Sequence, residues 1–311
     1  MKVERMEEKQ IKAFVGFIQN ICPNAIFDYK KGMFKVNGDW FDNTEDAFMV
    51  AQRGWKKYLE EIKMEISNLV IEVTRKCNMA CPHCLRGDAE KISFDYKMLP
   101  NVFSGIDYID TITFTGGEIT VALPTFEKIV DYICTRNIQF ENFYIKTNLK
   151  KVSKKFLLLV DMLYQKAEYN DISNLDFSFD IYHDSDEFIN NYWRYKDFQE
   201  ELCLADYITN LNVNKKPLEY KLIYEGNATK WFSFEDSYKK PSFFNGFFKE
   251  DDDCFCENIV YVAANGNVIS DCNLSYEHID EYAFGNVHKE TLREIIWKNT
   301  KSSDDIIEVV L

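Results

Sequence analysis

Three cysteines follow one another at short spacing in the middle of the first half of the chain. Three residues separate Cys77 from Cys81, and two separate Cys81 from Cys84. A thiolate is a soft ligand that suits iron–sulfur clusters and zinc, and cytosolic thiols are kept reduced rather than paired as disulfides. The cysteines come directly after the apolar run at 69–73, which predicts a buried strand. We therefore expect a metal or redox site on the loop that follows this strand.

The number of available ligands distinguishes two kinds of metal. A closed structural zinc site takes four protein ligands, commonly as two Cys-x-x-Cys pairs. This loop offers three cysteines and His83, and the adjacent Cys84 makes it difficult for His83 to join the same tetrahedron. A four-iron cluster that is held by three cysteines leaves its fourth iron open for a ligand that is not protein. The donor set therefore favours a four-iron cluster.

The cysteine pattern after a strand resembles the signature of radical S-adenosylmethionine (radical SAM) enzymes. The resemblance implies that Cys77, Cys81 and Cys84 are catalytic and bind a [4Fe-4S] cluster. The open iron of that cluster is chelated in the family by the amino and carboxyl groups of S-adenosylmethionine. The resemblance also implies an electron donor such as flavodoxin or ferredoxin.

A second match to the family lies at Gly116, Gly117 and Glu118, after the apolar run at 109–114. In the family, Gly-Gly-Glu at the end of the second strand hydrogen-bonds the methionine amino group of the cofactor. Two glycines let backbone carbonyls approach a ligand closely, and a carboxylate accepts from an ammonium group. A plain Gly-Gly turn would explain the glycines but not their coincidence with the cysteine loop.

The resemblance implies further cofactor-binding residues at later strand ends. Asn148 lies in Thr147-Asn148, which is similar to the Thr-Asn-Gly of the third strand, although Leu149 replaces the glycine. Ser178 and Asp180 alternate with apolar residues, and they either reach the ribose hydroxyls or form an ordinary solvent-facing row. His83 stands where the family usually places an aromatic residue beside the adenine.

A second cysteine group, Cys254, Cys256 and Cys272, surrounds the hairpin signal Asn265-Gly266. With a two-residue turn, Cys272 would lie opposite Ile259, about 10 Å along the strand from Cys256. Cysteine, hairpin, cysteine and helix resemble the auxiliary-cluster "twitch" domain of some radical SAM enzymes, a shortened relative of the SPASM extension. This implies a second iron–sulfur cluster whose fourth ligand is another side chain, Cys203 or substrate. A zinc site and no metal at all are the alternatives.

Strand and helix patterns alternate from Asn68 onward, which is typical of parallel βα units. We expect strands near 69–75, 109–115, 142–147, 174–182 and 219–225, and helices near 95–105, 124–136, 154–167, 185–203 and 228–238. The predicted fold class is α/β, an open (β/α)6 partial TIM barrel with its site at the carboxyl ends of the strands.

Three domains are predicted. Residues 1–66 form a helix-hairpin-helix extension that either covers the barrel or recruits substrate; residues 67–250 form the radical SAM partial barrel, and residues 251–311 form the twitch-like domain. In the last of these, Thr291 to Glu294 predicts a capping box that opens a helix.

The charge and the distribution of apolar residues argue against two classes of binding partner. The chain carries 37 basic and 51 acidic residues, a net charge of -14, which argues against phosphate-backbone binding as the main activity. No run of 18 or more apolar residues exists, and the first residues lack the apolar centre of a signal peptide. We therefore expect a cytoplasmic protein with no nucleic-acid or membrane partner.

The predicted function is that of a radical SAM enzyme. The resemblance implies reductive cleavage of S-adenosylmethionine to a 5′-deoxyadenosyl radical, which abstracts hydrogen from a substrate. A peptide that is oxidatively modified or cross-linked is the leading substrate. The sequence leaves open a small molecule such as a nucleoside or sugar. A zinc-stabilised, non-catalytic binding module is the alternative from another class, and it leaves Gly116 to Glu118 unexplained.

Overall fold

The computed structural model describes residues 2–19, 22, 25–36, 39–53, 64–178, 185–204, 223–233, 239–250, 254–301 and 306–311. Contacts between residues divide the chain into two compact units, Met1–Lys63 and Met64–Leu311. The boundary lies close to the one expected after residue 66. No second boundary separates 251–311 from the rest of the second unit. The C-terminal segment is therefore part of the same unit as the sheet that carries the cysteine loop.

The first unit is a small antiparallel sheet with two long helices. Its elements are η1 (Val3–Arg5), α1 (Glu8–Gln19), β1 (Ile26–Asp28), β2 (Met33–Val36), β3 (Asp39–Phe41) and α2 (Thr44–Arg53). The strand order is β1-β2-β3, so a third strand follows the expected hairpin. Phe34 on β2 is buried and packs edge-on against Phe14 of α1, with ring centroids 4.9 Å apart. This contact ties the sheet to the apolar side of α1.

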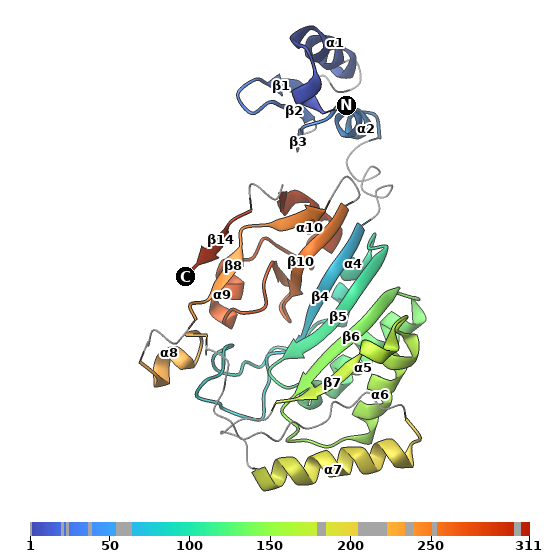
Figure 1. Ribbon diagram of the computed structural model, residues 1–311, viewed down its shortest axis with the longest axis vertical. Coiled ribbons are helices and arrows are strands. Elements are labelled where there is room, and N and C mark those ends of the chain that lie inside the picture. The colour runs from blue at the N-terminus through green and yellow to red at the C-terminus, as the bar shows by residue number, and fades with distance from the viewer. Residues whose placement is uncertain are drawn as a thin grey trace. The chain divides into compact units, whose positions relative to one another are not determined.

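The second unit is built on a nine-stranded, mostly parallel sheet (Figure 1). Four strands follow one another in the βα order that the sequence predicts: β4 (Met64–Thr74), β5 (Tyr108–Gly116), β6 (Phe140–Thr147) and β7 (Asn174–Phe177). The helical segments between and after them are η2 (Tyr96–Met98), α4 (Leu99–Phe103), η3 (Ile119–Ala122), α5 (Leu123–Thr135), α6 (Lys154–Lys166), η4 (Asn170–Ile172) and α7 (Ser185–Glu201). Most of the predicted strand at 219–225 lies outside the described residues. The structure therefore gives a mixed α/β fold with these four parallel strands, and the six-unit barrel stays a prediction.

The largest difference from expectation concerns β10 (Cys254–Val262). This strand lies inside the large sheet and pairs in parallel with β4, from Cys254 opposite Met64 to Val262 opposite Ile71. The sequence analysis placed it in a separate domain. Val260 and Tyr261 are fully buried on opposite sides of the strand, which is the pattern of a central strand rather than of a solvated hairpin.

Strands β9, β11, β12 and β13 extend this side of the sheet, whereas β8 and β14 pair with each other in a separate two-stranded sheet. The sheet order is β12-β11-β10-β4-β5-β6-β7, and β9 joins β10 to β13. Their bounds are α8 (Ala228–Trp231), β8 (Ser242–Phe244), β9 (Phe247–Glu250), β11 (Asn267–Ile269), α9 (Tyr276–Glu281), β12 (Gly285–Asn286), α10 (Leu292–Asn299), β13 (Thr300–Lys301) and β14 (Glu308–Val310). The capping box of α10 is present, with Thr291 and Glu294 bonded to each other's backbone N–H groups.

The turn between β10 and β11 contains three residues rather than two. Ala263 N–H donates to Asn267 O and Gly266 N–H donates to Ala263 O, both at 2.8 Å. Gly266 has a φ of +87°, which suits the left-handed position at the end of a three-residue hairpin loop. The register, with Tyr261 opposite Ile269, is one residue away from the expected one. The strand β11 then ends before Cys272, so the expected pairing of Cys272 with Ile259 is wrong.

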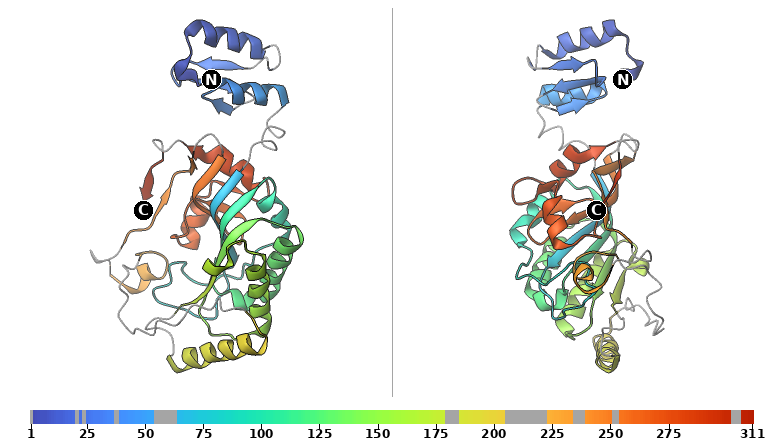
Figure 2. Two further views of the ribbon diagram at one scale, coloured as in Figure 1. Left: turned by 45° about the vertical axis from the view of Figure 1, so that its right-hand side comes forward. Right: turned by 90° about the vertical axis from the view of Figure 1, so that its left-hand side faces the viewer.

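Helices cover one face of the parallel strands (Figures 1 and 2). Helix α5 has a proline in its first turn and buries Phe126, Ile129, Val130 and Ile133 as one stripe. Those side chains join one core cluster with Ile112 and Phe114 of β5. A smaller core lies on the other face of the sheet, between β10, β11 and α9. These helices pack on the face of the sheet, whereas the candidate site is formed by the loops at the carboxyl ends of the strands.

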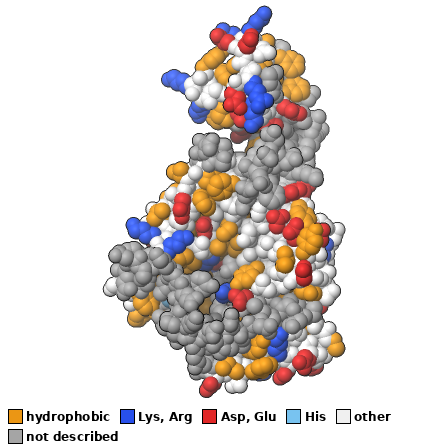
Figure 3. All heavy atoms as spheres, viewed as in Figure 1, with side chains coloured by type: hydrophobic (Ala, Val, Ile, Leu, Met, Phe, Trp, Pro, Cys, Tyr) orange, Lys and Arg blue, Asp and Glu red, His pale blue; other side chains and the backbone are white. Residues whose placement is uncertain are grey.

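Charges are mixed over the surface of the described residues. On the face shown in Figure 3, basic side chains lie among acidic and apolar ones. None of the described helices combines the length and the apolar character that crossing a bilayer requires.

The carboxylates of Glu65, Asp110 and Glu141 lie near the amino ends of β4, β5 and β6, respectively. Burial, together with Glu141 and Glu65, raises the pKa of Asp110 to about 6. An unfolded Asp titrates near 3.9, so the folded state binds this proton more tightly and the Asp110 carboxylate opposes folding above about pH 6.

Asp110→Asn is therefore expected to raise the melting temperature at pH 8 by about 2–4 °C, and to lose that gain as the pH falls toward 4. Thermal unfolding at both pH values measures the effect, and Asp171→Asn on the exposed η4 turn is the control. An equal gain at both pH values would contradict the electrostatic origin.

Candidate cofactor site

The cysteine loop begins where β4 ends, at Thr74. Cys77, Cys81 and Cys84 are half-buried and form no disulfide. Cys84 N–H donates to Cys81 O at 3.1 Å, and Met79 N–H donates to Cys77 Sγ at 3.4 Å. Burial raises the pKa of the Cys77 thiol, and the nearby Glu118 carboxylate adds to this rise. A positively charged metal centre would favour the thiolate that burial disfavours.

Among the residues that the structure describes, no three His, Cys, Asp or Glu side chains converge as ligands of one metal ion. The three cysteines of a four-iron cluster bind three different irons, so their sulfurs are spread around the cluster rather than gathered at one point. Three thiols on one loop, half-buried at the carboxyl edge of the sheet, are a donor set that fits such a cluster.

The Gly-Gly-Glu segment packs directly onto the backbone of the cysteine loop. Gly117 N–H donates to Thr74 O at 2.7 Å, and Glu118 N–H donates to Lys76 O at 2.8 Å. A Cβ atom on Gly116 would lie 2.2 Å from Thr74 O, and one on Gly117 would lie 2.4 Å from Lys76 O. The two motifs that the sequence analysis singled out separately are thus adjacent, and both glycines are required for this approach.

The Glu118 carboxylate already accepts four hydrogen bonds inside the protein. Its donors are Thr120 N–H (3.1 Å), Thr120 Oγ1 (2.7 Å), Thr147 Oγ1 (2.7 Å) and Asn148 N–H (2.8 Å). The residue is only 2% exposed. A carboxylate has about four acceptor positions, and three of these bonds crowd Oε1. In this structure Glu118 joins the end of β5 to the end of β6.

Glu118→Gln tests this joining role. An amide in place of the carboxylate must turn an NH2 group toward a backbone N–H of either Thr120 or Asn148. We expect a loss of about 1–3 kcal/mol in the free energy of unfolding, measured with urea. Glu127→Gln, in a partly exposed ion pair with Lys155, is the matched control and should lose less than about 1 kcal/mol. Unchanged stability combined with weaker cofactor binding would instead restore the ammonium-binding role.

The end of β6 brings Asn148 to the cysteine loop. Asn148 Nδ2 donates to Asn78 Oδ1 at 2.8 Å and lies 3.9 Å from Cys77 Sγ. Leu149 has a φ of +59°, a conformation that favours glycine, and its side chain is fully buried. The backbone therefore keeps the left-handed turn of a Thr-Asn-Gly segment although the residue is leucine, and packing of the side chain offsets the strain.

The other predicted cofactor residues are placed less specifically. Ser178 is half-buried, and its N–H donates to Thr147 O at 2.8 Å, which puts it beside the end of β6. Asp180 lies outside the described residues. His83 is half-buried within the cysteine loop itself.

The structure adds Gly226 and Asn227, which the sequence analysis did not assign to the site. Asn227 N–H donates to Cys84 O at 2.9 Å, and Asn227 Nδ2 donates to Cys81 O at 3.3 Å. A Cβ atom on Gly226 would lie 2.3 Å from Leu85 O, and the residue has a φ of +59°. A lone glycine after the apolar residues at 222–224 is the signal that the sequence offers for this contact.

A cavity of about 460 Å³ lies beside the cysteine loop. Its walls come from three segments, residues 86–90, 225–230 and 275–278. The buried Glu225 carboxylate spans two of them, because its Oε1 accepts from Ser275 N–H at 2.8 Å and lies 2.7 Å from His278 Nδ1. The cavity is lined mainly by polar and charged residues, so it is suited to a polar ligand that approaches the loop after Cys84.

Of the second cysteine group, the structure describes the side chains of Cys256 and Cys272, and these two belong to different cores. Cys256 is buried in the core on the helix-covered side of the sheet, where Val260 and Val262 also lie. Cys272 packs against the core on the opposite side, with Tyr261 and Ile269. The side chain of Cys254 lies outside the described residues. Because side chains alternate across a strand, the sheet itself separates Cys256 from Cys272.

Known proteins offer limited comparison. No family model matches the chain. An uncharacterized protein of Methanocaldococcus jannaschii is 32% identical over 95 residues, which is 29% of this chain and 33% of that protein. The chain thus matches about a third of the length of that relative.

Three solved structures are similar to parts of the chain. BtrN in complex with AdoMet and 2-DOIA is 15% identical with a TM-score of 0.41, covering 74% of this chain and 81% of BtrN. The enzyme anSMEcpe, with bound AdoMet and a peptide, is 14% identical with a TM-score of 0.43, covering 75% and 80%. Streptococcus suis SuiB bound to the precursor peptide SuiA is 11% identical with a TM-score of 0.39, covering 82% and 70%.

Proposed function

We propose that this chain is an iron–sulfur enzyme of the radical SAM type. One observation carries the proposal. The loop with Cys77, Cys81 and Cys84 is contacted by three other segments: Gly117 after β5 through the backbone, Asn148 after β6 through its amide, and Gly226 with Asn227 through the carbonyl of Cys84. Three thiols without this support would be an ordinary metal loop.

The chain's own residues have separate tasks in this proposal. Cys77, Cys81 and Cys84 would hold a [4Fe-4S] cluster through their three thiolates, and the backbone carbonyls of Gly116 and Gly117 would accept hydrogen bonds from the amino group of S-adenosylmethionine. Asn148, His83, Ser178 and Asp180 contribute further cofactor contacts. The bound cluster and cofactor supply one-electron reductive cleavage of the sulfonium and abstraction of a hydrogen atom. The protein keeps water out and aims this chemistry at one position of the substrate.

We further propose a peptide as substrate and a small ferredoxin or flavodoxin as electron donor. The motif resemblance supports both, and the polar cavity beside the loop, whose lining can hydrogen-bond backbone amides, supports the peptide. Incubation with candidate peptides and S-adenosylmethionine, followed by mass spectrometry, tests the substrate. A peptide whose mass falls by two hydrogens supports the proposal, and turnover of a nucleoside or sugar with every peptide unchanged would contradict it.

The number of clusters can be tested separately. Because Cys256 and Cys272 lie on opposite sides of the sheet, we expect anaerobically reconstituted protein to hold about 4 iron atoms per chain. Replacing Cys254, Cys256 and Cys272 together with serine should leave that number unchanged. An iron content near 8 that falls to about 4 in this variant would instead establish the auxiliary cluster that the sequence suggests, and zinc in place of iron would favour a structural metal site.

A further inference from the structure

Arg75 occupies the neck of the cysteine loop. Its backbone N–H donates to Ile92 O and its carbonyl accepts from Glu90 N–H, both at 3.0 Å, so the two ends of the loop meet at this residue. The three cysteines lie between these ends. Whatever orients Arg75 therefore orients the base of the whole loop.

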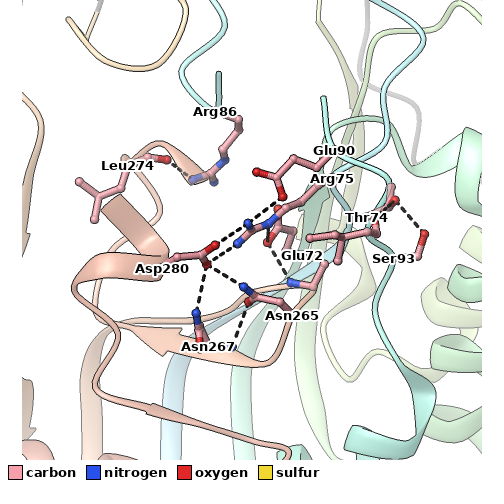
Figure 4. Close-up of polar contacts among 12 residues, drawn as sticks. Glu72, Thr74, Arg75, Arg86, Glu90, Ser93, Asn265, Asn267, Leu274 and Asp280 are labelled. Atoms are coloured by element: carbon pink, nitrogen blue, oxygen red, sulfur yellow. Dashed lines mark hydrogen bonds and ion pairs between the residues drawn. The ribbon is translucent and has the colours of Figure 1, made fainter. Parts of the chain in front are cut away.

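The Arg75 side chain is fully buried and points toward the carboxylates of Asp280, Glu90 and Glu72 (Figure 4). Its Nη1 and Nη2 donate to the two oxygens of Asp280 at 2.9 and 2.7 Å, and Nη1 also donates to Glu90 at 3.1 Å. Its Nε lies 3.4 Å from Glu72 Oε2, and the guanidinium stacks 4.5 Å from the ring centroid of Tyr276. The fork of donors is thus fixed in direction as well as in position.

Asp280 is itself held in place from the other side. Its Oδ1 accepts from Asn265 Nδ2 at 2.7 Å and from Asn267 Nδ2 at 3.1 Å, which tie it to the turn between β10 and β11. The same part of the chain makes two more contacts with the loop, because Arg86 Nη1 donates to Leu274 O at 2.6 Å and Tyr276 N–H donates to Arg86 O at 3.1 Å. Helix α9 and the turn therefore form a rigid support behind the loop.

A buried ion pair contributes little net stability compared with a well-packed apolar pair, because both charges lose their hydration. The ion pair instead fixes the orientation of Arg75, because the guanidinium cannot lose its proton and must keep its carboxylate partners. We infer that Arg75 is a positioning residue for the loop of Cys77, Cys81 and Cys84, and that Asp280 on α9 is its anchor. The inference rests on the proposed function only for what the loop holds.

Hydrogen exchange of the metal-free chain tests the inference without any cofactor. Asp280→Asn removes the anchor at a side chain that is 39% exposed, so the fold should survive. Amides at 75–92 should exchange about tenfold faster than in the wild type, while those of α5 keep their rates. Arg75→Lys, which keeps the charge but loses the fork, should give the same local pattern. The matched control is Asp88→Asn, because the Asp88 pair with Lys230 joins the same loop to α8 but is exposed.

A spectroscopic measurement on the reconstituted protein completes the test. At equal iron content, Asp280→Asn should change the electron paramagnetic resonance spectrum of the reduced cluster and weaken its response to S-adenosylmethionine, whereas Glu127→Gln, in the partly exposed pair with Lys155, should not. Unchanged exchange at 75–92, or faster exchange spread evenly over the chain, would overturn the positioning role. A wild-type chain that binds no iron would refute the proposed function, and the exchange result would still decide the role of Arg75.

Discussion

Replacing Cys77, Cys81 and Cys84 together with alanine is expected to abolish iron binding and leave the fold intact. All three are half-buried loop residues, and none belongs to the core clusters of the sheet. Their loss removes every proposed protein ligand of the cluster but little packed apolar surface. Iron and sulfide analysis after anaerobic reconstitution should fall from about 4 atoms of each per chain to near zero, with an unchanged circular dichroism spectrum.

A matched control uses a cysteine outside the loop. Cys134 lies on α5 and packs against the core, so Cys134→Ala should keep the full iron content at some cost in stability. If the triple variant retained the wild-type iron content, the loop would not be the metal site.

Gly117→Ala is expected to push the Gly-Gly-Glu segment and the cysteine loop apart. The added Cβ would lie 2.4 Å from Lys76 O, 2.7 Å from Lys76 C and 3.1 Å from Arg75 O, and all three are backbone atoms at the base of the cysteine loop. The backbone must move apart, so we expect a loss of about 1–3 kcal/mol of stability together with impaired reconstitution. Thermal unfolding of the metal-free chain and iron analysis measure the two effects.

Gly16→Ala provides the comparison for this substitution. Gly16 lies inside α1, and a Cβ there would meet nothing within 4 Å. Alanine is the better helix former, so this variant should gain about 0.5–1 kcal/mol. Wild-type stability and iron content in Gly117→Ala would mean that the Gly-Gly-Glu segment does not press on the cysteine loop.

Much of the α/β unit could be predicted from local patterns. The stripe of Phe126, Ile129 and Val130 identified α5, and Thr291 with Glu294 identified the start of α10. The partner of a strand is a different matter, because a short apolar run says that a strand is buried but not beside which strand. For this reason β10 was assigned to a separate domain, although its neighbour is β4 across almost 200 residues of sequence.

The same holds for the site: the sequence identifies the residues of local motifs but not their contacts with distant segments. The sequence identified the cysteine loop and the glycines, whose spacing is local. It could not show that the Glu118 carboxylate is already satisfied, because two of its donors, Thr147 and Asn148, come from the end of another strand. Nor could it show that Leu149 adopts the left-handed backbone conformation that a glycine at this position would favour. Such facts depend on the packing of distant segments.

The most direct test of the central claim is formation of 5′-deoxyadenosine. Anaerobically reconstituted wild-type protein, incubated with S-adenosylmethionine and dithionite, should release 5′-deoxyadenosine and methionine in equal amounts even without substrate. The variant with Cys77, Cys81 and Cys84 replaced by alanine should release neither above background. Absence of 5′-deoxyadenosine from wild-type protein that holds about 4 iron atoms per chain would contradict the account, and so would equal release by both proteins.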